Sequence, residues 1–153
     1  MNIDEYLEKI ENVEREYIPA FSALKPKRKI SLLETDIKDF LRARKRANYY
    51  QSVKDNNKVL EELYYNEVGL EQRASARARL RVKALTDAEL HMYVDMLEDK
   101  LYKARDCKIP GRASKMYDFI TAGCLFGSVV ENDIIKTALV DVRNQCDDLL
   151  NCL

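Results

Sequence analysis

The stretch TDAELHMYVDMLEDKL, residues 86–101, decides the fold class of this chain. Thr86 and Glu89 form a capping box, in which the hydroxyl and the carboxylate each satisfy a backbone N–H that the first helical turn leaves without a partner. Four apolar residues then follow at i, i+4, i+7 and i+11, the spacing of one helix face. They are Leu90, Val94, Leu97 and Leu101. We therefore predict an amphipathic helix that starts after Thr86 and is stopped by Pro110-Gly111.

The N-terminal third of the chain carries similar helix signals. Asn2 is a good N-cap for a first helix that Pro19 ends or kinks. Residues 25–29, Lys-Pro-Lys-Arg-Lys, are predicted to be a polar linker. Ser31 and Glu34 form a second capping box, so a second helix is predicted to begin there.

The remaining boundaries follow from polar breaks and glycines. Residues 55–57, Asp-Asn-Asn, are a plausible break, with one continuous helix across them as the alternative, and a third helix is predicted over about 58–85. The last residues are predicted to form a helical hairpin, with one helix over about 113–130 and a second capped by Asn132 or Asp133. Gly123 and Gly127 share one face of the first of these helices and allow close packing.

Composition supports a single all-α domain of 153 residues. Hydrophobic residues make up 46% of the chain and charged residues 34%. This composition is too apolar for a disordered chain. With four glycines and three prolines in the chain, turns are few and the elements must be long. We predict a bundle of about five or six helices, with long amphipathic helices and a basic middle over 1–108 and a compact hairpin over 112–153.

The cellular compartment is inferred from what the sequence lacks. The N-terminus is acidic and has no apolar core of a signal peptide, and no run approaches the length of a membrane span. The four cysteines show no CxxC spacing and are expected to be reduced. They are Cys107, Cys124, Cys146 and Cys152. The expected location is intracellular, in the cytoplasm or, in a eukaryotic cell, the nucleus, without membrane contact.

Charge is balanced overall but segregated along the chain. Residues 25–83 contain 16 Lys/Arg and 8 Asp/Glu, and the remainder contains 10 basic and 18 acidic residues. Within 25–83 the cations gather in three clusters, and the third includes an i, i+4, i+8 arginine ridge that could follow a phosphate backbone. Tyrosine pairs in the same region could stack on exposed bases. The candidate nucleic-acid-binding residues are Lys27, Arg28, Lys29, Arg42, Arg44, Lys45, Arg46, Tyr49, Tyr50, Arg73, Arg77 and Arg81.

Two functions fit this pattern. The first is a non-enzymatic helical module that binds DNA or RNA, or serves as an accessory subunit of a nucleic-acid-handling complex, through the basic 25–83 face. The second is a helical protein–protein adaptor or homo-oligomeric subunit, in which the basic part meets an acidic protein surface, including that of another copy. The arginine content and the tyrosines favour the first.

No catalytic or cofactor-binding pattern is found. His91 is the only histidine, and no Glu-x-x-His, HExxH, GxSxG, Walker or EF-hand motif occurs. Adjacent carboxylates such as Asp147-Asp148 point about 100° apart on a helix and do not form a paired site. We therefore expect no enzyme activity, no metal and no cofactor.

Two short segments of the sequence resemble segments of known protein families. Residues 77–90 followed by Tyr93 resemble the helical part of GINS replication subunits, where a basic helix precedes a Leu-Thr-x-x-Glu helix start. Residues 122–127, with Ile135 and Leu139, resemble the helical hairpins of some primase-associated domains. Both resemblances imply a place in DNA replication.

Overall fold

The computed structural model describes residues 4–5 and 18–152, and every regular element within them is helical. α2 (Pro26–Val53) and α3 (Lys58–Lys83) form a long antiparallel hairpin. α4 (Asp87–Asp106), α5 (Pro110–Gly127) and α6 (Asp133–Asn151) form a three-helix bundle. The predicted all-α class is confirmed. The helix predicted from Asn2 lies mostly outside the described residues, and a short helical turn at 18–22 precedes α2.

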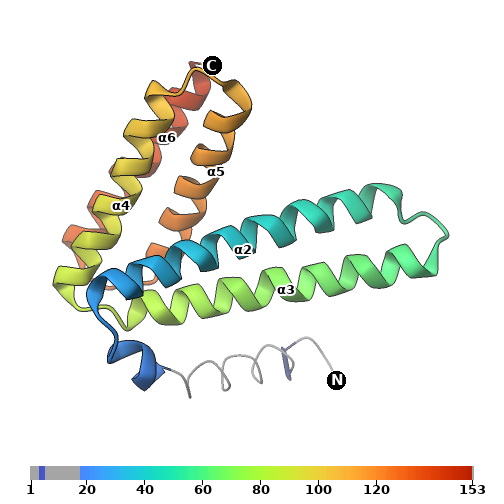
Figure 1. Cartoon of the computed structure of the whole chain (residues 1–153), viewed down its shortest axis with the longest axis horizontal. Helices are drawn as coiled ribbons and strands as arrows, with labels where there is room; N and C mark the ends of the chain where they lie inside the picture. Colours follow the sequence, from blue (N-terminus) through green and yellow to red (C-terminus); the bar gives the residue numbers. More distant parts are fainter. Residues whose placement is uncertain (1–3, 6–17, 153) are drawn as a thin grey trace.

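The two units diverge like the sides of a V (Figure 1). They meet where α2 begins and α3 ends, and the far end of the hairpin extends well beyond the bundle. We call the outer half of the hairpin, residues 42–73, the arm. Because the α2–α3 pair leaves the bundle at an angle, α2 and the α5–α6 side lie on opposite sides of a groove.

Several predicted boundaries are confirmed by cap geometry. Asn57 accepts hydrogen bonds from the backbone N–H groups of Val59 and Leu60 at 3.0 and 3.2 Å, after Asn56 turns the chain in the left-handed region at φ 56°. The capping box of Thr86 starts α4 with both of its reciprocal hydrogen bonds. Asn132 caps α6 through the N–H groups of residues 134 and 135.

Two predictions about prolines are wrong. Residues 25–29 are not a linker and Ser31 does not start a helix, because α2 already begins at Pro26. Pro110-Gly111 does not stop α4, which ends at Asp106; instead, Pro110 opens α5. In both cases proline occupies the first turn of a helix, where its fixed φ is favourable and its missing N–H would have had no partner.

The core lies at the meeting point of the two units. Fully buried apolar side chains come from each of the helices α2–α6, among them Ile37, Val82, Leu97, Ile120, Phe126 and Ile135. The predicted close packing at the α5 glycines is confirmed. A Cβ on Gly123 would lie 2.5 Å from Leu97 Cδ2, and one on Gly127 would lie 2.6 Å from Leu139 Cδ1. Tyr93 Oη also donates a 2.6 Å hydrogen bond to the Gly123 carbonyl, tying α4 to α5.

Candidate anion-binding groove

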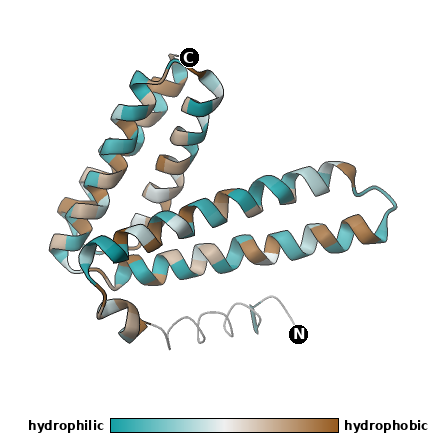
Figure 2. Ribbon diagram, viewed as in Figure 1, coloured by the Kyte–Doolittle hydropathy of each residue, from teal (hydrophilic) through white to brown (hydrophobic). Residues whose placement is uncertain are grey.

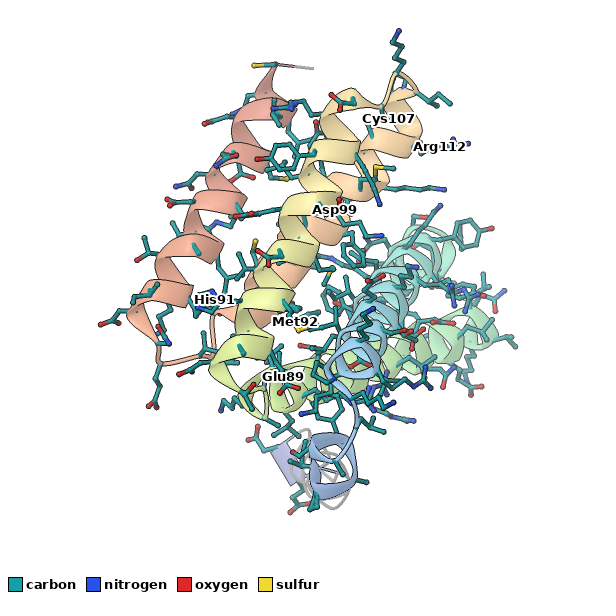
Figure 3. The ribbon with its side chains drawn as sticks, turned by 60° about the vertical axis from the view of Figure 1, so that its left-hand side comes forward. Glu89, His91, Met92, Asp99, Cys107 and Arg112 are labelled. Carbon is teal, nitrogen blue, oxygen red and sulfur yellow. The ribbon has the colours of Figure 1, made fainter. Side chains whose placement is uncertain are left out.

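A groove of about 1110 Å³ lies in the opening of the V, between α2 on one side and α5 with α6 on the other. Basic side chains from four helices line it. They are Lys38, Arg42, Arg44, Lys45, Lys100, Arg112, Lys115 and Arg143. Two acidic residues, Asp118 and Asp147, also line the groove. In Figure 3 Arg112 extends from the bundle on the side that faces the arm.

Most of these cations have no carboxylate beside them. Among the described residues, no ion pair within 4.0 Å involves the following five: Lys38, Lys45, Arg112, Lys115 and Arg143. Arg42 and Lys100 each have a carboxylate only at 3.9 Å. A concave surface with a large excess of one sign of charge, here eight cations against two carboxylates, concentrates the field and attracts counter-ions. The lining of the groove therefore carries an excess of positive charge.

The floor of the groove is apolar. Phe40 and Phe119 lie beneath two of the cations, with the Arg44 guanidinium 6.0 Å from the Phe40 ring centroid and the Lys100 ammonium 5.2 Å from that of Phe119. Further apolar lining comes from Leu41, Met116, Ala122, Leu125 and Leu150. Phe40, Phe119 and Ala122 are buried, so the hydrocarbon that an occupant would meet belongs to Leu41, Met116, Leu125 and Leu150.

A second hollow adjoins the groove. It has a volume of about 570 Å³, and Phe40 and Leu125 line both spaces. Arg79 and Lys83 are its cations, and Glu71 its carboxylate. Burial raises the pKa of Glu71, against the opposing charge of Arg44.

The middle basic cluster of the sequence lies at the groove. Three of its members, Arg42, Arg44 and Lys45, line the α2 wall, whereas Arg46 is exposed outside it. Tyr49 follows Arg42 by seven residues and therefore shares its helix face. Tyr49 is 62% exposed and makes an edge contact with Tyr50 at 5.6 Å, just beyond the groove lining.

The arginine ridge of α3 instead holds the hairpin together. Asp36 of α2 is buried and accepts hydrogen bonds from Arg77 Nε at 2.7 Å and from Arg81 Nη1 at 2.8 Å. Burial raises the pKa of Asp36, and the two guanidinium groups oppose that rise. Arg73 is exposed on the same helix. The hydrogen bonds to Asp36 hold Arg77 and Arg81 against α2 and leave them less able to bind phosphate.

The first basic cluster lies at the start of α2, away from the groove. Lys27 and Arg28 are exposed there. Lys29 is buried, and its ammonium group lies 2.9 Å from both carboxylate oxygens of Glu89. Figure 3 shows Glu89 at the first turn of α4, close to where α2 begins. Lys29 is thus a structural residue that joins the hairpin to the bundle.

Five groove cations were missed by reasoning from the sequence: Lys38 stands alone between two basic clusters, and the other four lie outside residues 25–83. Lys100, Arg112, Lys115 and Arg143 belong to the part of the chain that is acidic in sum. Summing charge along a segment hides which face each residue occupies. The i, i+3 spacing of Arg112 and Lys115 could have shown that they share a face. That this face is turned to α2 follows only from the packing of the two units.

Within the described residues, side chains that could bind a metal ion or act as nucleophiles are not gathered at one place. No group of three or more His, Cys, Asp or Glu side chains there could hold a metal ion. All four cysteines are free, and burial raises the pKa of Cys124 to about 12, so its thiol stays protonated at neutral pH. His91 is exposed on α4. Of the helices described, none is long and apolar enough to cross a membrane.

Comparison with known proteins finds no relative of this chain. No family model matches the chain, and neither the curated proteins nor the solved structures include a match. The resemblances to GINS subunits and to primase-associated hairpins therefore stay limited to the residues that carry them. The fold is that of an all-α protein. Its groove lies between a helical hairpin and a three-helix bundle and has basic walls and an apolar floor.

Proposed function

We propose that this protein is a non-enzymatic helical module that binds the phosphate backbone of nucleic acid in the groove between α2 and the α5–α6 side. The observation that carries the proposal is the excess of eight cations over two carboxylates along one groove. Arginine and lysine recognise phosphates without reading sequence, and binding releases the counter-ions condensed on the nucleic acid. The proposed contacts are Arg42, Arg44, Lys45, Arg112 and Lys115.

The shape of the groove favours a single strand over a duplex. Its apolar floor offers bases a surface that a duplex would not use, since the bases of a duplex are already stacked. Tyr49 lies on the same α2 face as Arg42 and is largely exposed, so it can stack on a base that leaves the groove. The expected strand follows the cations along the walls with its bases turned inward.

Fluorescence anisotropy of a labelled single strand and a labelled duplex, at about 50 and 200 mM salt, tests this proposal. If about five cations contact phosphates, single-strand affinity falls with a log–log slope of about −3.5, which is a loss of about 100-fold between the two salts. Arg112→Glu with Lys115→Glu should remove two contacts and flatten that slope by about 1.4. The absence of binding at the lower salt would rule out the proposal for this chain.

A matched control separates groove binding from net charge. Lys27→Glu with Arg28→Glu changes the charge by the same amount, but both residues lie at the start of α2 and outside the groove. The control should retain most of the single-strand affinity. Equal losses in both variants would show that the attraction is diffuse and that the groove is not the binding site.

An acidic amphipathic helix of another protein is the second candidate occupant. The apolar floor favours it, because Leu41, Met116 and Leu125 could accept the apolar face of a helix while the walls pair with its carboxylates. The affinity of such a complex falls less with added salt than that of a nucleic-acid complex, because burial of apolar surface contributes to binding. An acidic amphipathic peptide that binds tightly at 200 mM salt, where the single strand no longer binds, and that loses affinity in the Arg112→Glu and Lys115→Glu variant would favour this adaptor function.

A further inference from the structure

Large apolar side chains are exposed along the arm. They are Tyr49, Val53, Val59, Leu63, Tyr65 and Leu70, with exposed fractions from 38% to 65%. Figure 2 shows apolar residues at the free end of the hairpin, where Figure 1 shows that the bundle does not reach. Val59, Leu63 and Leu70 are spaced i, i+4 and i+11, so they share one face of α3.

The arm has almost no core of its own. In its α2 half only Ala43 and Ala47 are buried, and in the first part of α3 the only buried side chain is Glu67. One carboxylate oxygen of Glu67 has no hydrogen-bond partner in the described structure. Two helices cannot cover their apolar faces alone, and the usual solution is a further pair of helices.

Charge on the arm is split between its two helices. Residues 42–54 contain five basic and no acidic residues, whereas residues 58–73 contain four acidic and two basic residues. An antiparallel arrangement of two identical arms would place the basic helix of each copy against the acidic helix of the other. A two-fold axis makes both contacts equivalent, as isologous interfaces require.

We propose that the arm is a homodimerisation surface on which a second copy of this chain docks, arm against arm, to complete a four-helix bundle. The apolar stripe of α3 supplies the buried centre, and the opposite charges of the two helices set the orientation. This surface differs from the groove, but Tyr49 lies beside both, and Arg42, Arg44 and Lys45 border both. The tests therefore leave those three residues unchanged.

Analytical ultracentrifugation of the full chain from about 1 to 100 µM measures the association. The wild-type chain should approach twice the monomer mass over this range. Val59→Glu with Leu63→Glu should give a monomer with unchanged helical circular dichroism. Ile134→Glu with Val140→Glu is the matched control, since these apolar residues are 73% and 48% exposed on α6, away from the arm. A wild-type monomer throughout, or a dimer that the arm variant leaves intact, would overturn the proposal.

A charge-swap pair identifies the partner as a second copy and fixes the orientation. One chain carries Glu61→Lys with Glu62→Lys, so that both arm helices are basic near the tip. The other carries Arg46→Glu with Lys54→Glu, so that both are acidic there. Each variant alone should associate at least tenfold more weakly than wild type, and an equimolar mixture should regain the dimer. A mixture that stays monomeric, or homodimers of unchanged strength, would show that the arms do not pair in this way.

Discussion

Replacing Lys29 by methionine tests whether the buried pair with Glu89 holds the two units together. The side chains of these residues are only 5% and 6% exposed, so the pair belongs to the buried class and not to surface ion pairs worth about 0–1 kcal/mol. Removing one partner of a buried pair costs about 3–5 kcal/mol, because the other charge is left without compensation. Glu89 still receives the Thr86 N–H at 3.0 Å, so we expect the lower end, about 3 kcal/mol.

Urea unfolding followed by circular dichroism measures this loss, and thermal unfolding gives an independent value. For a chain of this length a loss of about 3 kcal/mol lowers the Tm by about 6–12 °C. Lys29→Met with Glu89→Gln should recover most of the stability, because glutamine also serves in a capping box and no charge is left buried. Lys27→Met, two residues earlier and exposed, is the control and should change stability by less than about 0.5 kcal/mol. A loss below about 1 kcal/mol for Lys29→Met would refute the structural role of the pair.

The same pair predicts the direction of a pH effect. Burial alone would raise the pKa of Glu89, but the Thr86 N–H and the Lys29 ammonium outweigh burial and lower it below the ordinary value of 4.5. A lowered pKa in the folded state means that ionised Glu89 stabilises the fold above about pH 4.5 and that this stabilisation is lost as the pH falls through the folded pKa. The stability advantage of wild type over Lys29→Met with Glu89→Gln should therefore be flat near neutral pH and shrink in acid.

Three further predictions concern the core. Asp36→Asn should cost about 2–3 kcal/mol in urea unfolding, because it removes the charge that two half-buried arginines face; a cost below about 0.5 kcal/mol would contradict this. Gly123→Ala should destabilise the fold by about 1–3 kcal/mol, since its Cβ would displace a buried leucine of α4. Gly111→Ala is the control, because a Cβ there meets open space, and the substitution should be neutral or stabilise by up to about 1 kcal/mol. Equal effects of the two substitutions would refute the close packing at Gly123. Cys124 should react with a thiol reagent only on unfolding, while exposed Cys152 reacts at once in the folded protein.

Short-range signals in the sequence were enough to predict the fold class and three helix starts. Asn57, Thr86 and Asn132 cap through side chains that reach only two or three residues ahead, so each cap can be recognised from a few consecutive letters. Pro26 and Pro110 could not be assigned in this way. Proline opens a helix as readily as it prevents one from continuing, and the choice depends on what the following turn packs against, here the burial of Lys29 and Ile30.

The candidate site was only partly predictable for the same reason. The cluster around Arg42 was visible because its members are neighbours in sequence. The opposite wall is built from α4, α5 and α6, whose cations are scattered among a larger number of acids. Conversely, the i, i+4, i+8 ridge of α3 gave a regular pattern, but Asp36 lies 41 residues from Arg77 and pairs with it only after the hairpin forms.

The long hairpin also gives the monomer a gradient of local stability along a single pair of helices. At its base, α2 and α3 are covered by the bundle and by the pairs of Asp36 and Glu89. Toward Val53 and Lys58 the buried apolar area falls to a few alanines, so each successive turn is easier to open. In the free chain, amide hydrogens should exchange fastest at the tip and progressively more slowly toward the base. Opening of the hairpin begins at the tip. A partner that covers the tip would therefore slow amide hydrogen exchange even in turns that it does not contact.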